Sequence, residues 1–475
     1  SMAAGPGARH RGNTTATRDQ ELRNVAATDD DDKPIESDLT GEWGNIALLM
    51  LLYTLQGVPM GVSQVMQLIL KEQKATFSDL ATFSLNSYPF VLKVLWAPIV
   101  DTVYLSRVGR RKTWLVPAQL AIGVVLLFLS GQLDRLLYSG ELQIAELTAL
   151  FFLLYLLCAT QDVAVDGWAL TMLRPENRSY AATTNSVGQT LGATLGYAGF
   201  VALEQLKLTT MTGFLYSWGI FFLVATTLVA FLKKEEPVQK DEEPPDVFTC
   251  YMEFASIARL RSIASVTLVL LTWKAPFSIA ESAPLKMQEA GLSKETLTWV
   301  MTGISPLYML LPVIVAKWTA GSTPFSLALT AYPWRLLLVA AMLVLVYATP
   351  TMMATMPAAH LAAVVSLTIA GACLSQAQFV SQMAFFASIS DPAIGGTYMT
   401  MLNTIGNLGG MWPNTLVMKC IDWASCLEAD CTIPRDGFYI LGVASLLVGV
   451  VWYFIGAPVA DRLQKLHAHE WRVSR

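Results

Sequence analysis

Twelve apolar runs, each long enough to cross a lipid bilayer as a helix, dominate this chain of 475 residues. A spanning helix needs about 20 apolar residues, and its backbone polar groups must be satisfied within the segment itself. Hydrophobic residues make up 54% of the chain and charged residues only 14%, whereas soluble domains carry about 25% charged residues. These features predict an all-α membrane protein with spans near 44–69, 78–103, 114–132, 144–173, 181–204, 216–232, 262–282, 296–316, 334–349, 361–388, 395–418 and 437–456.

The placement of Lys and Arg predicts the orientation, because loops on the cytosolic side of a membrane carry an excess of these residues. With both termini in the cytosol, the inner segments hold most of the 32 basic residues. We therefore predict a multi-pass protein whose two termini are cytosolic. Its expected divisions are a disordered tail at 1–43, a six-helix bundle at 44–232, a linker at 233–261, a second six-helix bundle at 262–457 and a tail at 458–475.

The cytosolic linker has two parts of different character. It begins with the charged run KKEEPVQKDEEPPD, and it then places Phe248, Tyr251, Phe254 and Ile257 shortly before Arg259. Such a pattern suits a short helix that lies on the membrane surface. A plain linker is the alternative interpretation.

A short motif occurs twice, 218 residues apart. NSVGQT begins at Asn185 and NTIGNL at Asn403, and each lies near the start of a span that is fifth in its own half. Matching halves are typical of transporters built by duplication. In each copy two amides share a helix face, Asn185 with Gln189 and Asn403 with Asn407. These amides either bond across a helix interface or line a substrate cavity, and the sequence leaves both options open.

Ionisable residues lie deep inside several of the predicted spans. With a rise of about 1.5 Å per residue, Asp162, Lys93 and Lys274 lie roughly 15 Å from the cytosolic ends of their spans, near the middle of the bilayer. An ion there costs at least about 2.5–3.5 kcal/mol unless it is paired or hydrated. We therefore predict that all three ions share a water-filled cavity.

Asp166 lies one helical turn from Asp162 on the same face. Two carboxylates this close resist simultaneous ionisation, which suggests a role in proton coupling. The alternative is structural, with both acids bonded to a lysine, an amide or a backbone group.

Four sequence motifs together resemble one known family. The loop after the second span reads WAPIVDTVYLSRVGRRKTWLVP, and its Gly109, Arg110 and Arg111 resemble the loop signature of the major facilitator superfamily. In the usual signature the acid lies three residues before this glycine, but here Asp101 lies eight residues before it. This longer variant, together with TQDVAVDGWALTML, NSVGQT and SDPAIGGTYMTMLNTIGNLGGMWPNT, resembles the acetyl-coenzyme A transporter family. A bacterial muropeptide permease is similar in the loop and the aspartate pair but less so in the last motif.

The resemblance implies a major facilitator fold of two six-helix pseudo-repeats. It also implies import of cytosolic acetyl-CoA by alternating access into the lumen of the endoplasmic reticulum, or of the Golgi, for lumenal acetylation. Acetyl-CoA and CoA are the expected ligands and the lipid bilayer is the expected surrounding. Neither a cofactor nor a nucleic acid is expected, and the oligomeric state, including a homo-oligomer, stays open. Exchange for CoA and coupling to protons are both open as the driving force.

Two alternatives remain for the function. The first is a proton-coupled symporter for a sugar-peptide, like the muropeptide permease. The second is a membrane-bound acetyltransferase, which would need a general base, often a histidine. Of the four histidines only His360 lies near a span, so we do not expect an enzyme.

An anionic nucleotide needs cations for its phosphates and aromatic surface for its base. Lys93 and Lys274 are the phosphate candidates, and Arg174, Arg178 and Arg335 could gather anions at the cytosolic mouth. The candidates for stacking on the base, with plain packing as the alternative, are Tyr53, Tyr88, Trp168 and Trp273. Other candidate cavity residues are Asp162, Asp166, Gln161, Asn185, Gln189, Gln378, Gln382, Asn403 and Asn407.

Other residues are expected to control movement. Asp101, Gly109, Arg110 and Arg111 form the predicted gating loop. Pro276 should kink the seventh span because it lacks a backbone N–H donor. Glu281 is interpreted either as a gate or as a residue at the membrane interface.

Three of the six cysteines, Cys420, Cys426 and Cys431, fall in the last outer loop. A lumenal compartment permits disulfides, so we predict one bridge among the three without assigning the pairing. No histidine lies nearby, and no metal site is expected.

Overall fold

A computed structural model describes residues 40–140, 142–174, 177, 179–235, 246–315, 318, 323–390, 395–426 and 435–472. Within these ranges the chain is helical, and its only β-type pairs are two isolated bridges. Eight of the described helical segments are long and apolar enough to cross a membrane. The predicted disorder of the N-terminal tail falls almost wholly outside the described residues.

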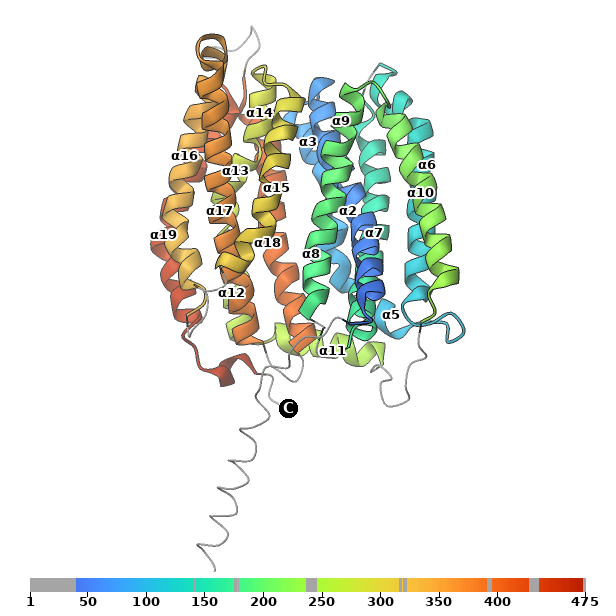
Figure 1. Ribbon diagram of the computed structural model, residues 1–475. Helices are drawn as coiled ribbons and strands as arrows, with labels where there is room; N and C mark the ends of the chain where they lie inside the picture. Colours follow the sequence, from blue (N-terminus) through green and yellow to red (C-terminus); the bar gives the residue numbers. More distant parts are fainter. Residues whose placement is uncertain are drawn as a thin grey trace, which may run out of the picture.

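The first six spans form one group of roughly parallel helices (Figure 1). The second span is broken into short pieces, whereas the fifth contains a π-helical segment. The elements are α2 (Trp43–Glu72), α3 (Phe77–Ser84), η1 (Leu85–Ser87), α4 (Tyr88–Leu92), η2 (Lys93–Leu95), α5 (Ala97–Thr102), α6 (Lys112–Tyr138), α7 (Ile144–Met172), α8 (Ser179–Thr194), η4 (Leu195–Gly199), α9 (Phe200–Gln205) and α10 (Met211–Leu232).

The last six spans form a second group beside the first (Figure 1). We call the two groups the N half (α2 to α10) and the C half (α12 to α19). The elements of the C half are α12 (Arg261–Thr272), η6 (Ala275–Phe277), α13 (Ser278–Glu281), α14 (Ala283–Glu289), α15 (Lys294–Val315), α16 (Ser326–Thr355), α17 (Pro357–Ile389), α18 (Gly395–Ala424) and α19 (Gly437–Leu463), followed by η9 (Ala468–Trp471).

A short helix, α11 (Val247–Ala258), lies across one end of both halves (Figure 1). It has one buried residue, Ile257, while Phe248 is 69% exposed. The Tyr251 hydroxyl donates a hydrogen bond to the Leu95 carbonyl of the N half. This part of the linker is helical, and its position on the membrane surface stays a prediction. We use α11 to name the two ends of the molecule: the α11 end and the opposite end.

Proline breaks the second and seventh spans. Pro89 lies in α4 and Pro98 in α5, and the intervening turn η2 starts at Lys93. Pro276 lies in η6 of the seventh span, directly after Lys274. Because proline lacks the N–H that a regular helix needs, the chain changes to tighter turns at these points. The predicted interruption at Pro276 is confirmed, and both breaks place a lysine at mid-span.

Glycines let pairs of helices approach closely in both halves. A Cβ atom added at Gly192 of α8 would lie 2.0 Å from the Thr54 carbonyl oxygen of α2. In the C half, a Cβ atom at Gly409 of α18 would lie 1.9 Å from the Leu270 carbonyl oxygen of α12. Small residues at such contacts are typical of membrane helices. These glycines hold α2 close to α8 and α12 close to α18.

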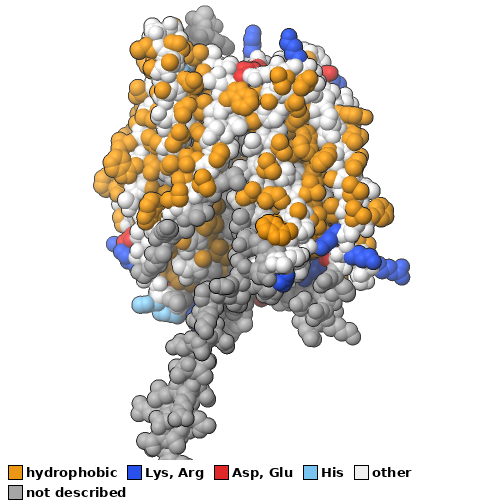
Figure 2. Space-filling model, in the orientation of Figure 1, with side chains coloured by type: hydrophobic (Ala, Val, Ile, Leu, Met, Phe, Trp, Pro, Cys, Tyr) orange, Lys and Arg blue, Asp and Glu red, His pale blue; other side chains and the backbone are white. Residues whose placement is uncertain are grey.

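The outer surface matches a membrane protein. Figure 2 shows apolar side chains over the flanks of the molecule and charged side chains mainly towards its two ends. Large apolar side chains are strongly exposed, among them Phe231 at 82%, Tyr347 at 75% and Phe454 at 72%. In a soluble protein such a surface would drive aggregation, whereas in a bilayer it contacts lipid.

Candidate functional site

Asp162 is the centre of a polar cluster in the N half. It lies on α7, is 3% exposed, and forms an ion pair with Lys93 of the broken second span. Its Oδ1 accepts hydrogen bonds from Gln56 Nε2 of α2 at 2.5 Å and from Gln189 Nε2 of α8 at 3.3 Å. Side chains from three other spans thus converge on one carboxylate. The lysine and the acid neutralise each other, so the cluster carries no net charge.

Asp166 lies one turn along α7 and has different partners. Its Oδ1 accepts from the Tyr53 hydroxyl at 2.8 Å and from Asn185 Nδ2 at 3.0 Å. Within the part of the chain that the structure describes, Asp166 forms no ion pair. The two acids of the pair therefore differ: one has a cation and the other has only neutral donors.

Several predicted cavity residues of the N half are packed in its interior. Tyr53 is 1% exposed and Trp168 is 3% exposed, so neither ring offers a free face to a nucleotide base in this conformation. Gln161 is fully buried and donates from Nε2 to the Leu52 carbonyl at 3.0 Å. Tyr88 is half-buried and donates its hydroxyl to Thr415 of α18 at 3.3 Å, which bridges the two halves.

Lys274 is the counterpart of Gln56 in the second half, at the same 218-residue offset as the repeated motif. Its Nζ donates to the Gly406 carbonyl at 3.3 Å and lies 5.4 Å from the centre of the Trp273 ring, which is fully buried. Among the described residues it forms no ion pair. The C half thus places a cation without a counter-charge where the N half places a neutral amide.

The amides of the second motif copy lie on the same helix as Gly406. Asn403 of α18 is half-buried and Asn407 is exposed. Gly406 lies between them, and a Cβ atom there would lie 2.7 Å from Gln382 Nε2. Gln382 is completely buried, and its amide has no hydrogen-bond partner among the described residues.

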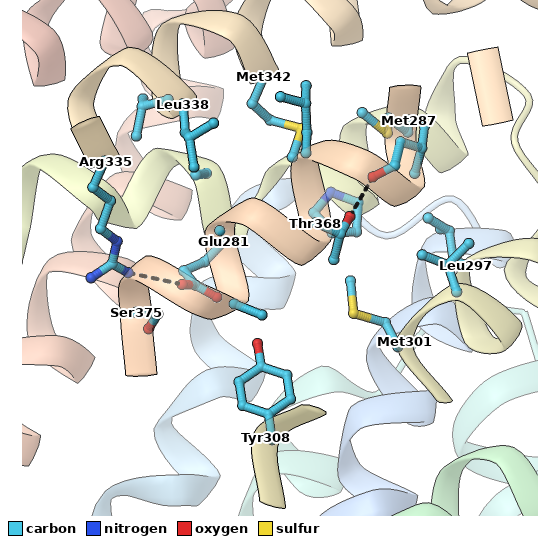
Figure 3. Close-up of a pocket in the computed structure, with 18 residues that line it drawn as sticks. Glu281, Met287, Leu297, Met301, Tyr308, Arg335, Leu338, Met342, Thr368 and Ser375 are labelled. Carbon is cyan, nitrogen blue, oxygen red and sulfur yellow. Dashed lines mark hydrogen bonds and ion pairs between the residues drawn. The ribbon is translucent and has the colours of Figure 1, made fainter. Parts of the chain in front are cut away.

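Arg335 is not at the cytosolic mouth, and this prediction was wrong. The helix α16 begins at Ser326 and not near residue 334, which places Arg335 nine residues, roughly 13 Å, inside it. Its Nη1 donates to Gln378 Oε1 at 2.6 Å, and its Nη2 lies 4.0 Å from Glu281 Oε1 (Figure 3). These partners compensate the charge, so the span does not have to end where the charge occurs.

Two cavities adjoin one another beside this arginine. The central cavity, of about 500 Å³, lies between the halves and is lined by α2, α8, η4, α13, α14, α15 and Gln376 of α17. The C-half cavity, of about 190 Å³, lies among α13 to α17 and includes Arg335. Five residues line both cavities: Glu281, Pro284, Leu297, Met301 and Tyr308.

The cavity linings refine the predicted set of polar residues. Gln376 lines the central cavity, whereas Gln378 and Gln382 are 1% and 0% exposed and lie inside the C half. Glu281, interpreted from the sequence as a gate or an interfacial residue, lines both cavities with its side chain 64% exposed. Neither lining includes Lys93 or Lys274. A single cavity shared by these ions stays a prediction.

The predicted gating loop is held by its own charges at the α11 end. Asp101 forms an ion pair with Arg111, and its carbonyl accepts from Arg110 Nε at 2.6 Å. Burial, with the adjacent Arg111 guanidinium, lowers the pKa of Arg110 from its usual range. Gly109 has a φ of +109°, which favours glycine. Despite its unusual spacing from the glycine, Asp101 is the loop's acid.

Two partners of this loop were not predicted. Glu235 accepts hydrogen bonds from the backbone N–H groups of Arg111 at 2.8 Å and Lys112 at 2.9 Å, at the start of α6. Gly167 makes room for the arginine, because a Cβ atom there would lie 2.1 Å from Arg111 Cζ. The only sequence signal for this contact is a glycine directly after Asp166.

The remaining predicted residues lie at the ends of the molecule. Arg174 donates its backbone N–H to Glu42 Oε1 at 2.8 Å and so ties the chain after α7 to the start of α2. Arg178 lies outside the described residues. Cys426 is disulfide-bonded and Cys420 is free, while Cys431 also lies outside the described residues. No group of three metal-binding side chains occurs in the described ranges.

The halves are joined at the opposite end by polar contacts. Lys294 of α15 forms ion pairs with Glu72 and Glu204 of the N half, both at 3.0 Å. Gln288 Nε2 donates to the Leu68 carbonyl at 2.9 Å, and the Ser78 backbone N–H donates to Asp422. These contacts close this end of the interface between the halves.

The two paired groups of helices have the major facilitator fold. The solved structure of a bacterial homologue of the human lysosomal transporter Spinster has a TM-score of 0.54 at 16% identity, covering 92% of this chain and 99% of the other. The nucleoside transporter NupG has a TM-score of 0.59 at 13% identity, covering 87% and 99%. At these identities the likeness shows the fold, and it confirms the predicted fold class.

The sequence comparison then gives the family. The family model described as acetyl-coenzyme A transporter 1 matches residues 45–244, 238–346 and 328–429, so this chain belongs to the acetyl-coenzyme A transporter family. An uncharacterised protein of Schizosaccharomyces pombe is 32% identical over 467 residues, which cover 90% of this chain and 89% of that protein. The predicted family is confirmed.

Two further relatives place the chain more broadly. An uncharacterised membrane protein of Saccharomyces cerevisiae is 27% identical over 543 residues, covering 90% of this chain and 96% of that protein. The anhydromuropeptide permease of Escherichia coli K12 is 27% identical over 218 residues, but covers only 45% of this chain and 41% of the permease. The resemblance to muropeptide permeases is therefore partial.

Proposed function

We propose that this protein carries acetyl-CoA from the cytosol into the lumen of the endoplasmic reticulum or Golgi by alternating access, without covalent chemistry. The observation that carries the proposal is the family match, which extends over most of the chain and coincides with a major facilitator fold. In such folds the substrate site lies between the two halves near the bilayer midplane. The central cavity, which lies between the halves among α2, α8 and α15, supports this position for the site.

The charges around the midplane suit an anionic cargo. Lys93 is neutralised by Asp162, and Arg335 faces Glu281, whereas Lys274 forms no ion pair among the described residues. An ammonium group without a counter-ion is costly in a membrane. A phosphate of CoA, brought to it as the halves move, would supply the missing charge. We therefore assign the phosphate contact to Lys274 in preference to Lys93.

The drive is either exchange for CoA or coupling to protons. Asp166 favours the second option as a candidate, because its protonation would break no ion pair among the described residues. Protonation of Asp162, in contrast, would leave the Lys93 ammonium without its carboxylate. If protons are coupled, Asp166→Asn should flatten the dependence of uptake on external pH.

Uptake by purified protein in liposomes tests the proposal directly. Labelled acetyl-CoA is supplied outside, and vesicles hold CoA, a pH gradient or neither; we expect intact acetyl-CoA to accumulate. Lys274→Met should weaken binding about tenfold or more, because a hydrogen bond to a charged group contributes about 1.5–3 kcal/mol. The control is Lys465→Met, which removes an exposed lysine whose ion-pair partner is Asp461.

Three results would contradict the proposal. Uptake no greater than in protein-free vesicles would exclude transport of this cargo. Preferential uptake of a muropeptide would favour the sugar-peptide symporter. Acetylated product without intact cargo inside the vesicles would indicate an acetyltransferase.

A further inference from the structure

The C-half cavity is an apolar compartment with a polar edge. Three methionines, Met287, Met301 and Met342, lie around it together with leucine and valine side chains. Figure 3 shows Glu281, Arg335 and Tyr308 grouped on one side and the methionines on the other. Such an arrangement fits a ligand with a polar head and an apolar tail.

The polar edge is close to neutral. The Arg335 guanidinium donates to Gln378, lies 4.0 Å from a carboxylate oxygen of Glu281, and packs 4.3 Å from the centre of the Phe277 ring. Because Glu281 already balances the arginine, a second carboxylate would add an uncompensated negative charge. A neutral acceptor, such as the carbonyl oxygen of a thioester, suits this edge better than a free carboxylate.

The compartment is larger than an acetyl group requires. Its volume is about 190 Å³. One water molecule in the liquid occupies about 30 Å³, and an acetyl group has the size of only a few water molecules. Methionine side chains are flexible, so a wall built from them can repack around tails of different length. Gly371 leaves additional room, because a Cβ atom there would meet no heavy atom within 4 Å.

We propose that this compartment receives the acyl group of the cargo and admits acyl thioesters with chains longer than acetyl. The inference rests on the proposed function, because it takes the CoA part of the ligand to lie in the adjoining central cavity. The compartment and the central cavity share Glu281, Leu297, Met301 and Tyr308, so one ligand can occupy both. The thioester carbonyl would then lie at the polar edge and the alkyl chain among the methionines.

Competition against labelled acetyl-CoA in the same liposomes tests this inference. The competitors are CoA and its acetyl, butyryl, hexanoyl and octanoyl thioesters, with free octanoate as a separate arm. Each methylene buried should tighten binding about fourfold, since its transfer from water contributes about 0.8 kcal/mol. We expect this gain to continue until the compartment is full and then to stop, and we expect octanoate to compete at least tenfold more weakly than octanoyl-CoA.

Two glycine variants separate the compartment from general apolar binding. Gly371→Leu should fill the space and remove the gain with chain length. Gly303→Leu is the matched control: this glycine is exposed on α15, lines neither cavity, and also has no heavy atom within 4 Å of an added Cβ. This control variant should show the same gain in binding with acyl chain length as the wild type. Gly371→Ala, with a single added methyl, should give a smaller effect in the same direction.

The possible failures are distinguishable. A flat series in wild-type protein that binds acetyl-CoA would overturn this inference and leave the proposed function standing. An unchanged gain in Gly371→Leu would place the acyl chain elsewhere, and equal competition by octanoate would remove the thioester from the recognition. If acetyl-CoA itself does not bind, the proposed function and this inference fail together.

Discussion

At the residue scale, the membrane-embedded charges of this protein differ in how they are compensated. Lys93 and Asp162 pair across 69 positions of sequence, and two amides occupy further acceptor sites of the acid. Removing one partner of a buried pair is costly, because the other charge stays behind without compensation. Lys274 has no such partner among the described residues. Substitutions of the two lysines should therefore differ in kind.

We expect Asp162→Leu to be the most destabilising of these changes, because it leaves the Lys93 ammonium buried without an acid. The cost should approach about 3–5 kcal/mol, reduced to the extent that the lysine side chain is 26% exposed. Lys93→Met should cost less, since Gln56 and Gln189 still donate to the carboxylate. The double variant should recover part of the loss. Thermal unfolding in detergent measures all three.

Lys274→Met is the control for this series, and it should reduce cargo binding while leaving the unfolding temperature close to that of the wild type. If the double variant is as unstable as the sum of the singles, the ion pair does not couple the two residues. If Lys274→Met is as destabilising as Asp162→Leu, its role is structural and its assignment to a phosphate is wrong.

At the scale of elements, the contact between α2 and α8 sets the geometry of the polar cluster. Gln56 and Gln189 reach Asp162 from these two helices. The helices approach closely because Gly57 and Gly192 have no side chain at the contact. An added Cβ atom would lie 2.3 Å from a carbonyl oxygen at Gly57 and 2.0 Å from one at Gly192. This helix contact therefore combines glycines for packing with amides for bonding, and one of the amides, Gln189, belongs to the repeated motif.

Gly192→Ala should push these helices apart. Overpacking typically costs about 1–3 kcal/mol, and the clashing atom is a backbone oxygen that cannot rotate away. Gly131→Ala is the matched control, because this exposed glycine of α6 has no heavy atom within 4 Å of an added Cβ. It should be neutral or stabilise the helix by up to about 1 kcal/mol. Equal unfolding temperatures in detergent for the two variants would contradict the role of the close contact.

At the scale of the whole molecule, the two halves are held together by polar contacts at the end opposite α11. Lys294 joins α15 to Glu72 and Glu204 of the N half. A transporter that alternates its access must break such contacts in each cycle. Their strength therefore influences how the protein divides its time between its conformations.

Lys294→Met should raise the population that is open at this end. Two ion pairs of about 0.5–1 kcal/mol each would shift the equilibrium roughly fivefold to thirtyfold. Distances between spin labels on the two halves at this end measure the shift. Arg135→Met is the control, because this arginine lies at the same end and its ion pair with Glu146 stays inside the N half. A similar shift in both variants would show that loss of positive charge, and not loss of the contact between halves, opens this end.

The sequence by itself determined the number and order of the spans, the pseudo-repeat and the family. The physical reason is that every helix that crosses a bilayer must span the same thickness, so each crossing appears in the sequence as an apolar run of similar length. The proline at position 276 likewise predicted the break in the seventh span, because its effect on the backbone is local.

Only the tertiary structure decided which charges meet. The pairing of Lys93 with Asp162, the depth of Arg335 and the choice of Gln376 over Gln378 as a cavity residue depend on how each helix is rotated and which neighbours it faces. A linear pattern states that a charge is buried, but its partner comes from another helix many residues away. For that reason the sequence placed Arg335 at a helix end, while packing against Glu281 and Gln378 places it inside the bundle.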